Sequence, residues 1–338
     1  MLTLKGWTPS YVASLSCFSV LEHSLVGTTR ESLGGFDEEL NLIRIPEVLF
    51  LPTERLQIVQ QGVPLEAVLY EDHFELGLRR LKRNLKERSQ ESLRCIDEDV
   101  CILANACSRT FGHWMEELLK VFILERNGFS GTYVIESSTA NKLNYESLAL
   151  LGVPRSRIRH VDTPAVFKSA VFATNVCHEN AHKFRSILLG LRNTLYERVG
   201  KYSRSIPRAW LVRGVGANVK RGGITNASEV AEILRKYDFE CIDFGALSFA
   251  DQLRIDRTVD VLGGVHGSAM VHAGFLCDQR EIVEIFSPHF LNPSIIQLCR
   301  ALGHKYNQVV PAYRGESKSS REDFHVDIDH LELICSQL

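Results

Sequence analysis

The sequence lacks any apolar run long enough to cross a membrane. A spanning helix needs about 20 consecutive apolar residues, and charged or polar side chains interrupt every apolar stretch of the 338 residues before that length. The most leader-like segment, residues 12–21, contains or adjoins three serines and precedes no Ala-x-Ala cleavage site. We therefore expect a cytoplasmic protein and leave open its attachment to the inner face of a membrane.

Two further absences concern metals and nucleic acids. The nine cysteines form no Cys-x-x-Cys pair and no spacing typical of zinc ligands or of a disulfide framework. Asp97, Glu98 and Asp99 form an Asp-x-Asp that precedes an expected strand, so we interpret it as a polar loop, as we do Asp327 and Asp329. With 39 basic and 41 acidic residues there is no basic excess. We expect no metal site and no nucleic-acid partner.

The order of elements predicts two α/β domains. Residues 100–175 alternate strand, helix and strand, which is typical of a parallel sheet with crossover helices. A polar break at 200–206 separates this half from a second alternating series over 208–310. We expect an N-terminal domain at 1–200, a C-terminal domain at 206–315, and a tail at 316–338 that packs back on the N-terminal domain.

The segment "VLGGVHGSAMVHAGFL", residues 261–276, joins a buried strand to a helix. The strand ends at His266 and Gly267, and Ser268 is the natural N-cap of the helix. A helix N-terminus at the carboxyl end of a parallel strand suits an anion such as a diphosphate. The segment equally fits a tight turn with a capping serine, since its glycine spacing matches neither a dinucleotide-binding loop nor a P-loop.

Charged residues near other strand ends favour the anion-binding interpretation. Arg213 ends the strand at 208–213, and Arg221 lies in the loop that follows, where both guanidinium groups can bind phosphate. Glu284 lies near the end of the strand at 281–287, where a carboxylate can accept hydrogen bonds from a ribose.

Several short motifs, in order along the chain, resemble glycosyltransferase family 61, whose members include plant xylan transferases, animal protein O-linked N-acetylglucosaminyltransferases and bacterial polysaccharide-biosynthesis proteins. The similar segments are "FGHWMEELLKVF", "WLVRG", "KRGGITNASE", "LSFADQL", "GVHGSAMVHAGFL" and "EIVEIF". The matching residues of the C-terminal half are Arg213, Arg221, Ile224, Asn226, Phe249, Gln252, His266, Gly267 and Glu284.

The resemblance implies a GT-B-like α/β fold, with two Rossmann-like parallel-sheet domains facing across a cleft. It implies inverting transfer of a hexosyl or pentosyl group from a UDP-sugar to a glycan or polysaccharide hydroxyl, with no metal required. Asn226, Gly267 and Ser268 would then help to bind the donor, and Glu284 would bind its ribose. His266 would act beside the leaving phosphate. Whether the chain forms a homo-oligomer is left open.

The general base is expected on the helix within residues 107–128. His113 and Glu117 are four residues apart and therefore share a helix face, and either side chain could remove the proton of the acceptor hydroxyl.

Two other functions remain open. One is a non-catalytic member that binds a glycan or a nucleotide, because His272 and Lys120 depart from the family pattern. The other is a hydrolase with Ser268 as nucleophile, although the sequence lacks the Gly-x-Ser-x-Gly elbow that such an enzyme needs.

Overall fold

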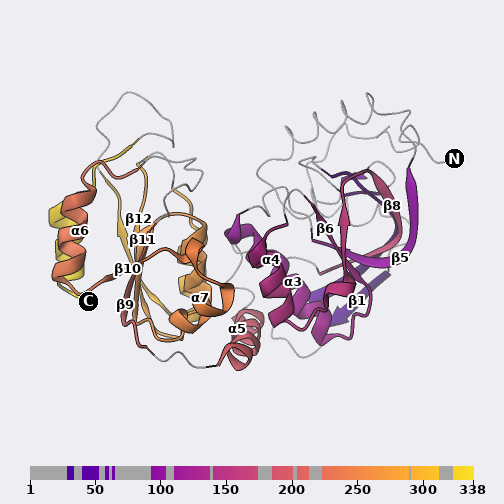
Figure 1. Cartoon of the computed structure of the whole chain (residues 1–338), viewed down its shortest axis with the longest axis horizontal. Helices are drawn as coiled ribbons and strands as arrows, with labels where there is room; N and C mark the ends of the chain where they lie inside the picture. The colour runs from indigo at the N-terminus through magenta and orange to yellow at the C-terminus, as the bar shows by residue number, and fades with distance from the viewer. Residues whose placement is uncertain are drawn as a thin grey trace. The chain divides into compact units, whose positions relative to one another are not determined.

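The computed structural model describes most of the chain as two compact units, Met1–Val176 and Cys177–Leu338. Figure 1 colours the first unit from indigo to magenta and continues through orange to yellow in the second. The described residues are 29–33, 40–52, 58–60, 63–64, 93–103, 110–137, 140–173, 185–200, 204–212, 223–288, 291–311 and 323–338.

The N-terminal unit contains an eight-stranded mixed sheet of order β4-β3-β2-β8-β5-β6-β7, with β1 paired to β2. The strands are β1 (Thr29–Leu33), β2 (Leu40–Phe50), β3 (Ile58–Gln60), β4 (Val63–Pro64), β5 (Arg94–Ile102), β6 (Thr132–Glu136), β7 (Ile158–Val161) and β8 (Ala165–Ala173). Strands β5 to β8 pair in parallel, whereas β1 to β4 and the β2–β8 pair are antiparallel. The parallel pairing that the sequence predicted over residues 100–175 is confirmed for β5 to β8. The antiparallel strands β1 to β4 precede that range, and the connections between them are too short for a crossover helix.

Helix α3 (Phe111–Arg126) follows β5 and is buried along most of its length. Its Trp114 donates a hydrogen bond from Nε1 to Oγ of Ser147, at 2.9 Å, and so joins α3 to helix α4 (Lys142–Leu150). The short 3-10 helix η4 (Arg155–Arg157) leads into β7. A core cluster of the unit lies on the sheet, with most of its side chains from β2, β5 and β8.

The acidic triplet was expected to be a polar loop but lies inside β5. Each carboxylate pairs with a basic side chain of another strand of the sheet: Asp97 with Lys168 on β8, Glu98 with Arg159 on β7, and Asp99 with Arg44 on β2. These ion pairs explain the acidic residues as part of the polar surface of the sheet.

The C-terminal unit has a five-stranded sheet that is parallel throughout, with order β10-β9-β11-β12-β13. The strands are β9 (Arg208–Leu211), β10 (Glu240–Ile242), β11 (Val261–Val265), β12 (Glu281–Ile285) and β13 (Lys305–Val309). Counted along the chain, this order is 2-1-3-4-5, the doubly wound arrangement of flavodoxin-like folds. It confirms the parallel sheet that the alternation of strands and helices predicted for this half.

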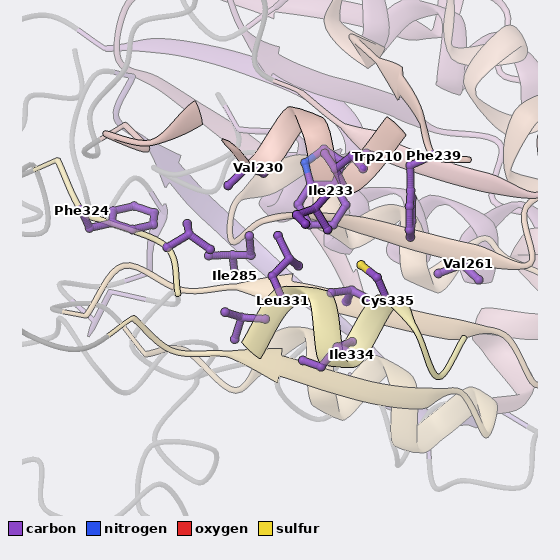
Figure 2. Close-up of a cluster of buried hydrophobic side chains, with 14 residues drawn as sticks. Trp210, Val230, Ile233, Phe239, Val261, Ile285, Phe324, Leu331, Ile334 and Cys335 are labelled. Atoms are coloured by element: carbon purple, nitrogen blue, oxygen red, sulfur yellow. The ribbon is translucent and has the colours of Figure 1, made fainter. Parts of the chain in front are cut away.

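Helices cover both faces of this sheet (Figure 1). They are α5 (Arg185–Val199), α6 (Ala227–Lys236), α7 (Phe249–Asp256), α8 (Ser294–Leu302) and α9 (Ile328–Cys335), with short 3-10 helices η6 (Phe244–Ala246) and η7 (Ser268–Gly274). On one face, α6 and α9 pack together over an apolar cluster that includes Trp210 of β9 and Ile285 of β12. Figure 2 shows Leu331 and Cys335 of α9 directed into this cluster. Helices α5 and α7 pack on each other at the other face.

The tail differs from the prediction, because it belongs to the C-terminal unit. Phe324 pairs with Ile224 in a parallel bridge, and Asp327, expected in a loop, caps α9 by accepting a hydrogen bond from His330 N–H. Arg208 of β9 donates to the carbonyl of Leu338. The tail therefore completes one face of the C-terminal sheet.

The expected boundary at 200–206 also differs from the structure, because α5 packs within the C-terminal unit. Arg192 donates to the carbonyl of Leu276 at 2.7 Å and to Asp278 Oδ1 at 2.6 Å. Tyr196 donates to the carbonyl of Phe275. An amphipathic helix pattern gives the period of a helix but not the sheet on which it packs.

Candidate functional site

The carboxyl ends of β9 and β11 lie side by side at the topological switch point of the C-terminal sheet. Gly264 of β11 is in register with Leu211 of β9, and the chains leave the sheet in different crossovers from there. In open parallel sheets, ligands bind beyond the strand ends at this point. His266 follows β11 directly. Arg213 and Arg221, which the sequence predicted as phosphate ligands, lie outside the described residues.

His266 is the first of three linked side chains that we call the His266 relay: His266, Glu284 and Tyr306. Nδ1 of His266 lies 2.7 Å from Oε1 of Glu284, and the hydroxyl of Tyr306 donates to Oε2 of Glu284 at 2.6 Å. The Glu284 side chain is fully buried and that of His266 is 8% exposed. Glu284 therefore does not present its carboxylate at an open edge, as the predicted contact with a ribose requires.

Stacking and burial fix the relay in place. The His266 ring lies parallel to the ring of Phe286, with centroids 4.8 Å apart and an interplanar angle of 17°. Burial, followed by the charge of Glu284, raises the pKa of Tyr306, which keeps its phenol protonated as a hydrogen-bond donor. Cys299 of α8 lies near Glu284, and burial with that same charge raises its pKa to about 12, so its thiol is not a nucleophile at neutral pH.

The glycines of β11 are explained by packing. A Cβ on Gly263 would lie 2.2 Å from Cε3 of Trp210, and one on Gly264 would lie 2.9 Å from Sδ of Met270. The two faces of the strand therefore need glycine for different neighbours, and packing is sufficient to explain both positions.

The turn after β11 differs from the expected helix. Ser268 begins η7, a 3-10 helix of seven residues whose N-cap position is Gly267, and no side chain caps it. The expected capping by Ser268 is therefore wrong, and so short an element gives little helix dipole for an anion. Among the described residues, the non-glycine positions with positive φ are Glu47, Asp238 and Gln279, so Ser268 has no strained nucleophile elbow either.

Asn226 was predicted to bind the donor, but its buried amide binds the tail. Nδ2 donates to the carbonyl of Val326 at 3.0 Å, while Oδ1 accepts from the N–H of Val326 at 2.9 Å. These two bonds to the backbone of Val326 use both ends of the amide, so Asn226 has a structural role.

The predicted base candidates lie on α3 in different surroundings. His113 is 35% exposed, and its Nδ1 lies 3.7 Å from Oε2 of the buried Glu116. Glu117 is fully buried, and Lys120 donates to both of its carboxylate oxygens, at 3.0 and 3.2 Å. The two candidates thus have different partners although they are one helical turn apart.

The burial of Glu117 and Lys120 is offset by their mutual attraction. Desolvation raises the pKa of Glu117, and Lys120 opposes that shift. Desolvation lowers the pKa of Lys120, but Glu117 and Glu116 outweigh it, so that the net shift is upward and Lys120 stays charged. The buried Glu117 cannot contact an acceptor hydroxyl in this conformation.

Two features of the C-terminal unit were missed by the sequence analysis. On β13, Tyr306 lies two residues before Gln308, the register partner of Glu284, and therefore on the same face of the sheet. Knowledge of the strand order, with the alternation of side chains along a strand, could have identified it. A second buried pair joins Nδ1 of His272 to Oδ2 of Asp256 at 2.6 Å, next to the ring of Phe244. This pair ties η7 to the end of α7, and no local sequence signal marks it.

Within the described ranges, no group of three or more His, Cys, Asp or Glu side chains is arranged to hold a metal ion. Of the helices that the structure describes, none combines the length and apolar character needed to span a bilayer.

Comparison with known proteins identifies the family. The sequence profile of the family described as Glycosyltransferase 61 matches residues 111–283, which run from α3 into β12. The chain belongs to this family, and its class is that of the glycosyltransferases. This confirms the resemblance found in the motifs.

No curated protein matches the sequence. Among solved structures, a crystal structure of the dodecameric iron-containing heptosyltransferase TibC in complex with ADP-D-beta-D-heptose is similar at 12% identity and a TM-score of 0.31. The similarity covers 90% of this chain and 87% of that chain. At that TM-score the family assignment depends on the sequence match alone.

Proposed function

We propose that the protein is an inverting glycosyltransferase that moves a hexosyl or pentosyl group from a nucleoside diphosphate sugar to a hydroxyl of a glycan or polysaccharide. A UDP-sugar is the donor expected from the family. The GT-B arrangement of the two units, a reaction without a required metal, and a cytoplasmic location are parts of the same proposal.

The observation that carries the proposal is the position of His266 at the carboxyl end of β11, next to β9. This is the switch point at which doubly wound sheets bind nucleotides. Arg213 and Arg221 follow β9 in the sequence and add positive charge for a diphosphate. Gly267 has no side chain, so a ligand can approach its backbone closely.

The proposed chemistry is a single displacement. The acceptor oxygen forms a bond to the anomeric carbon, while the bond from that carbon to the diphosphate oxygen breaks and the diphosphate takes the electron pair. We assign the acceptor proton to His113, the more exposed of the two base candidates. His266, Arg213 and Arg221 stabilise the charge that develops on the diphosphate.

Calorimetric titration with UDP, GDP, CDP and CMP, each with and without magnesium, tests the donor site. We expect one nucleoside diphosphate to bind, and His266→Ala to weaken it about tenfold or more, since a hydrogen bond to a charged group is lost. His330→Ala, on an exposed face of α9, is the matched control and should bind as the wild type does. Absence of binding by all four nucleotides would contradict the site.

His113→Ala tests the assignment of the base. We expect it to lower kcat for sugar transfer by about 10²-fold or more, while the nucleotide affinity stays within about twofold of wild type, since His113 acts on the acceptor. Unchanged kcat would remove His113 from the reaction.

A second candidate function is a non-catalytic protein of the same family that binds a nucleotide or a glycan. The ion pair that binds Glu117 to Lys120 favours it, because this pair leaves one of the two expected bases unable to act. Slow hydrolysis of a UDP-sugar without an acceptor would distinguish the two, since only a transferase is expected to cleave the donor.

A further inference from the structure

Glu284 occupies the position where a nucleotide-binding strand commonly offers a carboxylate to a ribose, yet both of its oxygens have protein partners. Oε1 faces Nδ1 of His266 and Oε2 accepts from Tyr306, within a side chain that is fully buried. A ribose contact would require this carboxylate to leave its burial. At the end of β12, the Glu284 carboxylate therefore binds His266 and Tyr306.

The geometry points to Glu284 and Tyr306 as positioning residues for His266, which hold its ring so that Nε2 contacts the diphosphate of the donor. This inference rests on the proposed function. It says that His266, at the end of β11, binds the diphosphate of the donor and that Glu284 makes no contact with the ribose.

The direction of the hydrogen bonds follows from the chemistry of the three groups. Tyr306 donates to Glu284, and its raised pKa keeps it a donor. The inference makes the carboxylate the acceptor for both neighbours, which places the proton between Glu284 and His266 on Nδ1. A carboxylate that binds one ring nitrogen of a histidine fixes the tautomer and the orientation of the ring.

The ring also has little freedom to turn. Its face stacks on Phe286, and the His266 backbone N–H donates to the carbonyl of Ile285 at 2.8 Å. With Nδ1 bound to Glu284, Nε2 is on the opposite edge of the ring. Gly267 follows directly and has no side chain to hinder the approach of a phosphate group to its backbone.

The test compares UDP with inorganic pyrophosphate, which has the diphosphate but no ribose. If Glu284 and Tyr306 act through His266, Glu284→Gln and Tyr306→Phe weaken both ligands by the same factor, about tenfold for Tyr306→Phe. If Glu284 instead binds the ribose, Glu284→Gln weakens UDP alone and Tyr306→Phe has no effect. Either of these results overturns the inference.

Tyr196→Phe is the matched control, because it removes a second buried phenol hydroxyl, bonded to the Phe275 carbonyl, in the same unit. We expect both ligands to bind it with wild-type affinity. Equal weakening in this control would mean that loss of stability, not the relay, explains the effect, and would also overturn the inference.

The wild-type protein gives an independent readout that needs no variant to fold. Nitrogen NMR of ¹⁵N-labelled histidine should show the unliganded His266 protonated on Nδ1, with Nε2 shifting on addition of pyrophosphate. Protonation on Nε2 alone would overturn the inference. Absence of wild-type binding by both ligands would instead contradict the proposed function, so the two failures are distinguishable.

Discussion

At the scale of single residues, Gly263 shows how a core aromatic determines a backbone position. Trp210 is 3% exposed and packs edge-on against Phe239, with ring centroids 5.7 Å apart. The Trp210 ring therefore has little room to move away from a side chain placed at position 263 of the neighbouring strand β11. Position 263 of β11 therefore requires glycine for packing. His266 directly follows the end of the same strand.

Gly263→Ala should lower the free energy of unfolding by about 1–3 kcal/mol, because the new methyl group overlaps the Trp210 ring. Urea unfolding followed by tryptophan fluorescence measures the change. Gly223→Ala is the matched control, since among the residues that the structure describes its Cβ would meet only Oδ1 of Asp323, at 3.5 Å. It should change stability by less than about 0.5 kcal/mol. Equal effects of the two substitutions would contradict the packing argument.

Also at this scale, His266 and Glu284 of the candidate site could be found from the sequence, but Tyr306 and the contacts among the three residues could not. The position of His266 at a strand end follows from local pattern. Its bond to Glu284 depends on β12 lying beside β11, and the bond of Glu284 to Tyr306 depends on β13 lying beside β12. Strand order is a property of the folded sheet.

At the scale of elements, the tail segment before α9 is joined to the start of α6. Phe324 exchanges backbone hydrogen bonds with Gly223 and Thr225, and the Asn226 amide binds the backbone N–H and C=O of Val326. Together these contacts align α9 beside α6, where the two helices cover one face of the sheet.

Asn226→Ala should lower the free energy of unfolding by about 2–4 kcal/mol, since it removes two hydrogen bonds and leaves the buried N–H and C=O of Val326 without these partners. Nucleotide affinity, measured below the unfolding transition, should stay within about twofold. Asn307→Ala, which removes one 3.4 Å hydrogen bond to Ile282 at a partly buried site, should cost less than about 1 kcal/mol. Lost affinity at wild-type stability would return Asn226 to the donor site.

A histidine between α8 and β13 is held in its neutral form. Nδ1 of His304 accepts from the N–H of Arg280 at 3.1 Å, and Nε2 lies 3.0 Å from the carbonyl oxygen of Ala273, to which it donates. Burial lowers the pKa of His304 below its ordinary value. Protonation would replace the acceptor on Nδ1 with a second donor facing Arg280 N–H.

At the scale of the whole molecule, the lowered pKa of His304 makes the free energy of unfolding depend on pH. An unfolded histidine takes up a proton near pH 6.5, whereas His304 in the folded state does so only at a lower pH. Between these two values the unfolded state binds more protons, so the free energy of unfolding rises with pH. The contribution of His304 is complete above about pH 6.5 and is lost as the pH falls below that value.

Urea unfolding between pH 8 and pH 5 measures this dependence. His304→Gln should be less stable than wild type by about 1–3 kcal/mol at pH 8, from lost hydrogen bonds, and the difference should shrink as the pH falls below 6.5. The exposed His330→Gln should follow the wild-type curve. A difference that stays constant with pH would contradict the neutral state of His304.

The two units differ in how much of their topology the sequence determines. In the C-terminal unit, strands and helices alternate strictly, and right-handed crossovers then leave few arrangements other than a parallel sheet. In the N-terminal unit, β2 is followed by the short strands β3 and β4, and β8 inserts between β2 and β5. Because hydrophobic pattern does not encode which edge a strand joins, the mixed sheet could not be predicted.

The sequence by itself determined the family, the parallel C-terminal sheet and the position of His266 at a strand end, because each depends on residue type and spacing along the chain. Only the tertiary structure decided that Glu284 bonds to His266, that Asn226 binds the tail and that Lys120 neutralises Glu117. A buried polar side chain must take its hydrogen-bond partners from whatever packs against it. Those partners are set by the order of strands and by helices distant in sequence.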